Sequence, residues 1–352
     1  MSLERNSGIN GFAVEMKMHR WAMEPAALQA FMDALASLPA TAALPAIDVA
    51  APRRGLKVHN GTAVIAVSGV LLKTFPAWLR LWGIVGTGYD EIRAQLDEAM
   101  ASKSVKAIEL HVASPGGVVD GLADTADAIR AARQTKPVTA VVEDLAASAA
   151  YWLASQAQEI EANRTAEIGS IGVYTVYVDR SKADKKRGRK IIVIRSGEHK
   201  GMGVDGVTDE QVNAVQEIVD ALNTQFVNAV AEGRGLPSER IRALATGRLW
   251  LADAAREYKL IDVVTRMEMN PLQDNQGGLA MDEKHDSLSA VGVMQSRRQP
   301  ATRTFVQAAK ALAQQTGMKL GDAFKKVACE QPELYDRHIA ALGIVRPTRN
   351  NP

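Results

Sequence analysis

The sequence predicts an α/β fold with parallel strands and with helical segments at both ends of the chain. From about Leu56, apolar runs of strand length alternate with segments of helical periodicity, which is typical of parallel βαβ units. The chain has 352 residues, of which 47% are hydrophobic, enough for a sizeable core. After about Met267 the composition turns polar and aperiodic. We therefore divide the chain into an N-terminal segment (1–55), a main domain (56–267) and a C-terminal tail (268–352).

The N-terminal segment is expected to contain one helix that begins at Pro25, because proline is favoured in the first turn of a helix. Four apolar residues would share one face of this helix: Leu28, Phe31, Met32 and Leu35. We interpret this face as packing against the main domain, and a docking arm for a partner protein is the alternative. A linker rich in Pro and Ala is expected over residues 38–52.

The main domain is expected to begin with a buried strand, T-A-V-I-A-V-S-G-V, and to continue with helices and strands in alternation. The further strands are expected at 107–113, 137–143 and 189–195. Three helices are expected at 89–102, 121–135 and 148–158. A longer helix is expected from Thr208, where T-x-x-Q forms a capping-box pattern. Its apolar face would consist of Val215, Ile218, Val219, Leu222 and Phe226.

The C-terminal tail is expected to start with a linker or disordered segment that extends to about Thr304. Two short helices are expected after it, at 305–315 and 320–328. The single cysteine, Cys329, follows them and is interpreted as a packing residue.

Composition argues against several classes of protein. The net charge is +2, which gives no case for nucleic-acid binding. The basic run at 179–190 is interpreted as a solvated loop, with DNA contact as the alternative. One cysteine indicates a reducing compartment, and neither a signal peptide nor a membrane anchor is recognised. We therefore expect a cytoplasmic protein, and no metal or cofactor is expected.

Two strand-to-helix junctions carry candidate chemistry. The first is A-S-P-G-G, where Gly116 and Gly117 follow a strand that ends at Val112. Adjacent glycines let backbone N–H groups approach a ligand without obstruction by a Cβ, which suits an anion or a developing oxyanion. The same four letters S-P-G-G also form an ordinary turn.

The second junction is D-L-A-A-S-A-A-Y-W-L-A, where Ser148 would lie just past a strand and at the start of a helix. Open α/β folds place their sites at this carboxyl edge of the sheet. Small alanine neighbours leave room for a substrate carbonyl, so Ser148 is a candidate nucleophile. The alternative is a small residue that allows close helix packing.

A nucleophilic serine needs a base. None of the six histidines stands in a recognisable triad pattern. A lysine is the alternative, and Lys200 lies in the glycine-flanked run S-G-E-H-K-G-M-G. An ordinary lysine amine is protonated at neutral pH, so this role would require the fold to bury Lys200 and lower its pKa.

Taken together, these motifs resemble peptidase family S49, the signal peptide peptidase A group. The resemblance covers about Leu56 to Arg266 and includes, in order, S-G-V, S-P-G-G, A-A-S-A-A-Y-W-L-A, I-G-S-I-G-V, S-G-x-x-K and G-R-L-W-L-A-D. It implies a Clp-protease/crotonase-like fold of repeated ββα units and a Ser-Lys dyad. The residues that match the family's functional positions are Ser148 (nucleophile), Lys200 (general base), Gly116, Gly117 and Ala149 (oxyanion hole), and Ser170 (orientation of the lysine).

The sequence departs from the bacterial pattern in two respects. Many bacterial members read Ser-Gly-Gly where this chain reads Ser148-Ala149-Ala150, which predicts a tighter pocket. The chain also has one catalytic unit with N- and C-terminal additions, an arrangement that resembles the phage and prophage head maturation proteases. This resemblance implies scaffold or capsid proteins as substrates, self-cleavage after Met267, and a homo-oligomer that shares its active site between subunits.

Other functions stay open at this point. A bacterial member of the family would process signal peptides or degrade peptides in general. A crotonase-like acyl-CoA enzyme would use the same backbone donors but would need neither Ser148 nor Lys200. A scaffold or assembly protein with this fold would need no catalysis, and the composition of the tail allows it.

Overall fold

A computed structural model describes residue 16 and residues 19–38, 55–177, 179, 181–197, 200 and 206–265, together with a few positions between 308 and 330. The expected C-terminal linker, Cys329, and most of the expected linker at 38–52 and of the two tail helices lie outside the described residues. The chain divides into two units, 1–264 with 345–352, and 265–344. The division of the chain into three segments stays a prediction.

The larger sheet has the strand order β11-β10-β8-β6-β3-β2. Four of its strands run parallel: β3 (Thr62–Ser68), β6 (Ala107–Ser114), β8 (Val138–Ala147) and β10 (Glu167–Gly169). The outer strands β2 (Lys57–His59) and β11 (Leu249–Leu251) are antiparallel to their neighbours. Two further strands extend it, β9 (Glu159–Asn163) beside β8 and β12 (Val263–Thr265) beside β9. All four carboxyl ends of the parallel strands therefore meet at one edge, the edge at which Ser148 follows β8.

The smaller sheet has the order β1-β7-β4-β5. Its strands have three residues each: β1 (Trp21–Met23), β7 (Gly116–Val118), β4 (Val70–Leu72) and β5 (Gly86–Gly88). All twelve positions are buried. Since β7 follows β6 directly, this sheet continues the main sheet at its carboxyl edge and carries the Gly-Gly pair with it.

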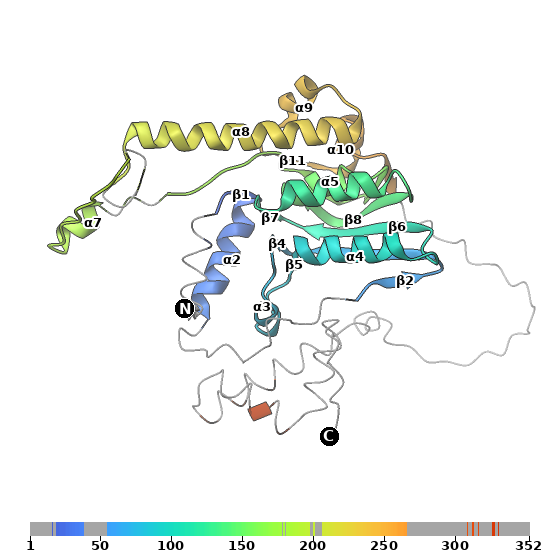
Figure 1. The fold of residues 1–352 in the computed structure, drawn as a ribbon, viewed down its shortest axis with the longest axis horizontal. Coiled ribbons are helices and arrows are strands. Elements are labelled where there is room, and N and C mark those ends of the chain that lie inside the picture. Colours follow the sequence, from blue (N-terminus) through green and yellow to red (C-terminus); the bar gives the residue numbers. More distant parts are fainter. Residues whose placement is uncertain are drawn as a thin grey trace, which may run out of the picture. The chain divides into compact units, whose positions relative to one another are not determined.

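Helices cover the strands (Figure 1). Those nearest the sheet are α4 (Tyr89–Ala101), α5 (Leu122–Ala132) and α6 (Ala149–Ala154). The others are α2 (Pro25–Ser37), α3 (Ala77–Leu81), α7 (Ser181–Lys186), α8 (Asp209–Arg234), α9 (Ser238–Leu244) and α10 (Ala252–Glu257). The order β6-β7-α5 is one ββα unit, and β3 and β4 open another that ends with α4. The expected α/β class with parallel strands and ββα units is confirmed.

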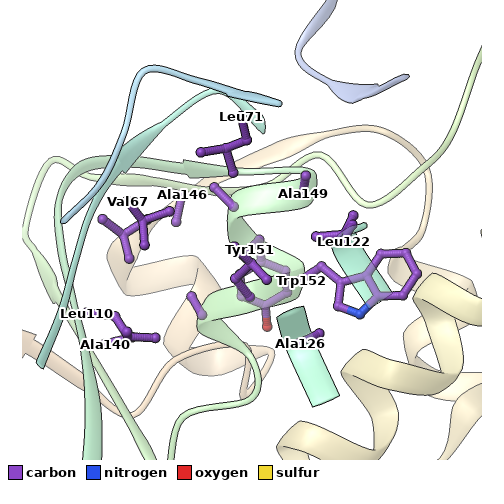
Figure 2. Close-up of a cluster of buried hydrophobic side chains, with 14 of the residues drawn as sticks. Val67, Leu71, Leu110, Leu122, Ala126, Ala140, Ala146, Ala149, Tyr151 and Trp152 are labelled. Carbon is purple, nitrogen blue, oxygen red and sulfur yellow. The ribbon is translucent and has the colours of Figure 1, made fainter. Parts of the chain in front are cut away.

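Helix α6 lies at the centre of the core, and its six residues are all buried. Figure 2 shows Tyr151 and Trp152 on different sides of α6, with Trp152 on the side of Leu122 and Ala126. Trp152 stacks on Phe226 of α8 with ring centroids 4.6 Å apart and an interplanar angle of 18°. The Tyr151 hydroxyl donates to the carbonyl oxygen of Leu260 at 2.8 Å. Each buried aromatic side chain contributes about 2–3 kcal/mol, so the helix that follows Ser148 is firmly held.

Local sequence signals at helix starts are confirmed. Helix α2 begins at Pro25 and buries Leu28, Phe31 and Leu35, while α8 begins after Thr208 with both hydrogen bonds of a capping box. The helix expected over 148–158 is shorter than expected, since α6 covers Ala149–Ala154.

The strand expected before α8 is wrong, and the expected apolar face of α8 is only partly buried. Residues 189–195 form no strand, although their β-branched residues favour one, because no strand of the described residues pairs with them. Ile192 is 71% exposed and Ile194 is 96% exposed. The apolar face of α8 is buried only toward its C-terminal half, where Phe226 is fully buried and Ile218 is 40% exposed. Among the described residues, no helix has the length and apolarity needed to cross a membrane.

Candidate active site

Ser148 occupies a strained turn between β8 and α6. Its backbone has φ 54° and ψ −119°, a region that residues with a Cβ rarely adopt. The Ser148 N–H donates to the Gly169 carbonyl oxygen at 2.7 Å, and the Ser148 carbonyl oxygen accepts from the Trp152 N–H at 2.9 Å. The turn is therefore held from both sides, by the neighbouring strand β10 and by the first turn of α6. Strain of this kind persists only where surrounding structure enforces it, and it concentrates at functional sites.

The side chain of Ser148 is buried but weakly engaged. The residue is 1% exposed, and its neighbours Ala147 and Ala149 are fully buried. Its hydroxyl donates to the carbonyl oxygen of Gly172 at 3.4 Å, a long contact. The hydroxyl is thus shielded from solvent, and this long contact is its one hydrogen bond within the described residues.

The Gly-Gly pair lies directly beside this turn. A Cβ on Gly116, whose φ is 99°, would overlap the Ala22 carbonyl oxygen and would lie 3.0 Å from the Ala147 carbonyl oxygen. A Cβ on Gly117 would overlap the carbonyl oxygen of Leu71. Glycine is therefore required at both positions, because backbone atoms of Ala22 and Ala147 approach Gly116 and those of Leu71 approach Gly117. One of these neighbours, Ala147, directly precedes Ser148.

Ser114 completes this loop, and sequence reasoning did not single it out. Its hydroxyl donates to the Gly69 carbonyl oxygen at 2.7 Å and accepts from the Gly116 N–H at 3.1 Å. The side chain is fully buried. The N–H of Gly116, an expected oxyanion donor, is therefore engaged by Ser114 in this structure. The S-P-G-G motif contains this serine, but only the fold reveals its two partners.

Ser170 lies on the other side of the nucleophile candidate. It follows β10, whose Gly169 is opposite Ala147 in the parallel pairing of β10 with β8. Ser170 is 5% exposed, has φ 50°, and its N–H donates to the carbonyl oxygen of Arg248 at 2.7 Å. The structure thus brings Ser148, the Gly-Gly loop, Ala149 and Ser170 together at one edge of the sheet.

Lys200 is in a different environment. It is exposed, and its N–H closes a turn by donating to the Gly197 carbonyl oxygen at 3.0 Å. No hydrogen bond joins Lys200 to Ser148 in the part of the chain that the structure describes. The expected dyad is not assembled within one copy of the chain.

Two tyrosines near the site, the buried Tyr151 and the half-buried Tyr174, stay neutral. Burial, with the negative charge of Glu24 as the smaller cause, raises the pKa of Tyr174 to about 12. Burial also raises the pKa of Tyr151 well above its usual range. Neither phenol is therefore a candidate base at neutral pH, and both remain hydrogen-bond donors.

Comparison with known proteins finds a family whose sequence model matches part of the chain. Residues 130–270 match the sequence model of Peptidase family S49, a span that contains Ser148, Ser170 and Lys200. This region is similar to peptidase family S49. The resemblance inferred from the motifs is confirmed.

Individual relatives include two phage proteins. The chain is 38% identical over 195 residues to head-tail preconnector protein GP5 of Enterobacteria phage P21, covering 54% of this chain and 38% of the relative. It is 37% identical over 188 residues to capsid assembly protease C of Escherichia phage lambda, covering 52% of this chain and 42% of the relative. It is 30% identical over 183 residues to protease 4 of Haemophilus influenzae, covering 50% and 29%. The match spans about two fifths of the length of the two phage relatives.

Proposed function

We propose that the protein is a serine endopeptidase in which Ser148 is the nucleophile and Lys200 the general base. The observation that carries this proposal is the strained, buried turn at Ser148, set between the Gly-Gly loop and Ser170 within a region similar to peptidase family S49. A packing serine would gain nothing from a backbone conformation that costs free energy. A crotonase-like acyl-CoA reaction is less well supported, because it would use the loop and leave this turn without a purpose.

The proposed chemistry needs no cofactor. The Ser148 hydroxyl oxygen attacks the peptide carbonyl carbon, and its proton passes to a neutral Lys200 amine. Backbone N–H groups of Ala149 and the Gly-Gly loop would stabilise the oxyanion. The C–N bond then breaks, and the lysine returns the proton to the leaving amine. Water, activated by the same lysine, hydrolyses the acyl-enzyme and restores Ser148. Ser170 would orient the lysine amine through its hydroxyl.

We further propose that Lys200 acts on Ser148 of another copy of the chain in a homo-oligomer. Two features of the structure support this. Lys200 is exposed whereas Ser148 is 1% exposed, and the residues that precede Lys200 present Ile192 and Ile194 to solvent at 71% and 96%. Exposed apolar side chains in such a cluster favour an interface. Docking would also remove water from the lysine amine, which a lysine base requires.

The proposed substrates are scaffold or capsid proteins of a phage, cut in the host cytoplasm or inside the prohead. The names of the two phage relatives, one of them a capsid assembly protease, support this setting. The polar sequence after Met267 is proposed as a site of self-cleavage, because exposed polar segments are preferred sites of proteolysis. Signal-peptide processing or general peptide degradation is the alternative within the same family.

The test is digestion of a proteome-derived peptide mixture, read by mass spectrometry, together with the intact mass of each enzyme. The wild type is compared with Ser148→Ala and Lys200→Ala. Ser37→Ala and Lys182→Ala are matched controls, since both side chains are exposed and lie outside the site. Cuts made by the wild type and both controls, and absent from the other two, would support the dyad. Equal behaviour of all five folded proteins would contradict it and favour an assembly role without catalysis.

A further inference from the structure

The N-terminal strand β1 lies along the Gly-Gly loop of the proposed active site. It pairs antiparallel with β7, with Trp21 opposite Val118 and Ala22 opposite Gly117. The pairing extends beyond both ends of the strand. The Glu24 N–H donates to the Pro115 carbonyl oxygen at 2.8 Å, and the Val119 N–H donates to the Arg20 carbonyl oxygen at 3.1 Å. The two strands are neighbours in Figure 1.

The other edge of β1 is also paired. The Trp21 N–H donates to the Tyr174 carbonyl oxygen at 2.8 Å, and the Tyr174 N–H donates to the Trp21 carbonyl oxygen at 3.0 Å. The Thr175 hydroxyl donates to the carbonyl oxygen of His19 at 3.3 Å. Strand β1 therefore fills a slot between β7, which carries the Gly-Gly loop, and the segment that follows Ser170.

The middle of β1 lies next to the nucleophile candidate. The Ala22 carbonyl oxygen is close enough to Gly116 that a Cβ there would overlap it, and the Ala147 carbonyl oxygen lies 3.0 Å from the same Cβ position. The Cα of Met23 is also 3.0 Å from it. The Ala22–Met23 peptide thus lies beside the residue that precedes Ser148.

An extended peptide that is to reach Ser148 must pair with a strand edge near it, because main-chain hydrogen bonds to a sheet edge are how proteins hold extended peptides. Both edges at this site are occupied by the chain itself. We propose that β1 is an internal occupant of the peptide-binding slot and keeps the proposed peptidase latent until it is displaced. This inference rests on the proposed function and concerns the regulation of the same site.

The contacts of β1 hold it in one position in the slot, but the strand is short enough for a competing peptide to displace it. Trp21 packs edge-on against Phe31 of α2, with centroids 6.5 Å apart, and His19 pairs with the exposed Asp120 at 2.9 Å. Only three residues form the strand itself. The Tyr174 hydroxyl is buried and has no hydrogen-bond partner in the described part of the chain. Burying a hydroxyl without a partner is unfavourable, so the seated strand leaves a polar group that a competing peptide could satisfy.

A reversible disulfide tests whether the strand must leave. Arg20 and Val119 are half-buried and directly opposite, so Arg20→Cys with Val119→Cys can be joined across the pair in a Cys329→Ser background. The probe is a fluorescein-labelled peptide H-R-W-A-M-E-P, the chain's own sequence from His19 to Pro25. Its binding is measured by fluorescence anisotropy with Ser148→Ala also present, so that the readout does not depend on catalysis.

We expect the oxidised protein to bind the probe at least about tenfold more weakly than the reduced protein, because apparent affinity falls with the fraction of open slot. Equal binding by the oxidised and reduced forms, both folded by circular dichroism, would overturn the proposal. The single variant Arg20→Cys, treated in the same way, controls for the oxidant and should show no change.

A second variant has the opposite effect to the disulfide, because it weakens the pairing of β1 instead of locking it. Ala22→Pro removes an N–H from the middle of β1 and weakens its pairing, so the probe should bind several-fold more tightly than to the parent protein. A folded Ala22→Pro protein that binds no more tightly would count against the proposal. If the variant does not fold, the comparison of the oxidised and reduced disulfide protein decides alone.

Hydrolysis of labelled casein by the same proteins with Ser148 intact separates this inference from the proposed function. If probe binding depends on the disulfide but no form of the protein hydrolyses casein, the peptidase proposal is contradicted. The proposal that β1 occupies the peptide-binding slot then still stands. If hydrolysis depends on Ser148 but is equal in the oxidised and reduced proteins, the peptidase proposal stands. The proposal that β1 keeps the site latent is then overturned.

Discussion

The turn at Ser148 and the segment that carries Lys200 belong to the same proposed reaction but differ in nearly every physical respect. Ser148 is 1% exposed, its backbone N–H and carbonyl groups are hydrogen-bonded, and its helix is fixed by the stacking of Trp152 on Phe226. Residues 189–195 form no regular structure and expose Ile194 at 96%. The chain therefore encloses Ser148 by itself, whereas Lys200 is exposed and, in the proposed reaction, would receive its environment from another copy of the chain.

The largest expected effect is the loss of hydrolysis when Ser148 or Lys200 is replaced. Mixed oligomers then test whether the two residues of one site come from different copies of the chain. Ser148→Ala and Lys200→Ala should each lower casein hydrolysis by about 10⁴-fold. When the two proteins are mixed and reassembled, about a quarter of the sites should regain both groups, since random assembly pairs an intact serine with an intact lysine at that frequency. Mixed oligomers that stay inactive would contradict a site shared between copies and favour a lysine that folds back within its own chain.

A smaller effect compares glycines in the two regions. Gly117→Ala should lower the free energy of unfolding by about 3 kcal/mol, because the added methyl group overlaps the backbone of Leu71, which has no rotamer with which to move aside. Gly197→Ala should change it by less than about 0.5 kcal/mol, since no described atom beyond the chain neighbours lies within 4 Å of the added Cβ. Urea denaturation measures both. Similar losses at the two positions would mean that the lysine segment is packed as tightly as the loop.

The smallest effect concerns strain at the nucleophile itself. Ser148→Gly should be more stable than Ser148→Ala by about 1 kcal/mol, because glycine adopts positive φ without the clash that a Cβ causes. Both variants lack the hydroxyl, so the difference isolates the backbone. Thermal unfolding of the two proteins gives the result. An alanine variant at least as stable as the glycine variant would show that the turn relaxes and that no strain is stored there.

Much of the fold was predictable from local patterns. The alternating apolar runs predicted β3, β6 and β8, and the starts of α2 and α8 followed from Pro25 and from the capping box at Thr208. The strand expected at 189–195 was wrong, because β-branched periodicity describes a preference that only a neighbouring strand can satisfy. The expected apolar face of α8 is only partly covered: Phe226 is fully buried, Val215, Val219 and Leu222 are half-buried, and Ile218 is 40% exposed.

The sequence by itself determined the residue types and the order of the site: a serine between alanines after a strand, two adjacent glycines after another, and a lysine between glycines. These signals are local, so they could be read along the chain. The tertiary structure decided how they meet. The hydrogen bond of Ser114 to Gly69 and the pairing of β1 with β7 join residues 45 and about 100 positions apart. Such contacts depend on how the whole sheet closes, which no local pattern encodes, and they determine both the shape of the loop and what lies in the slot beside Ser148.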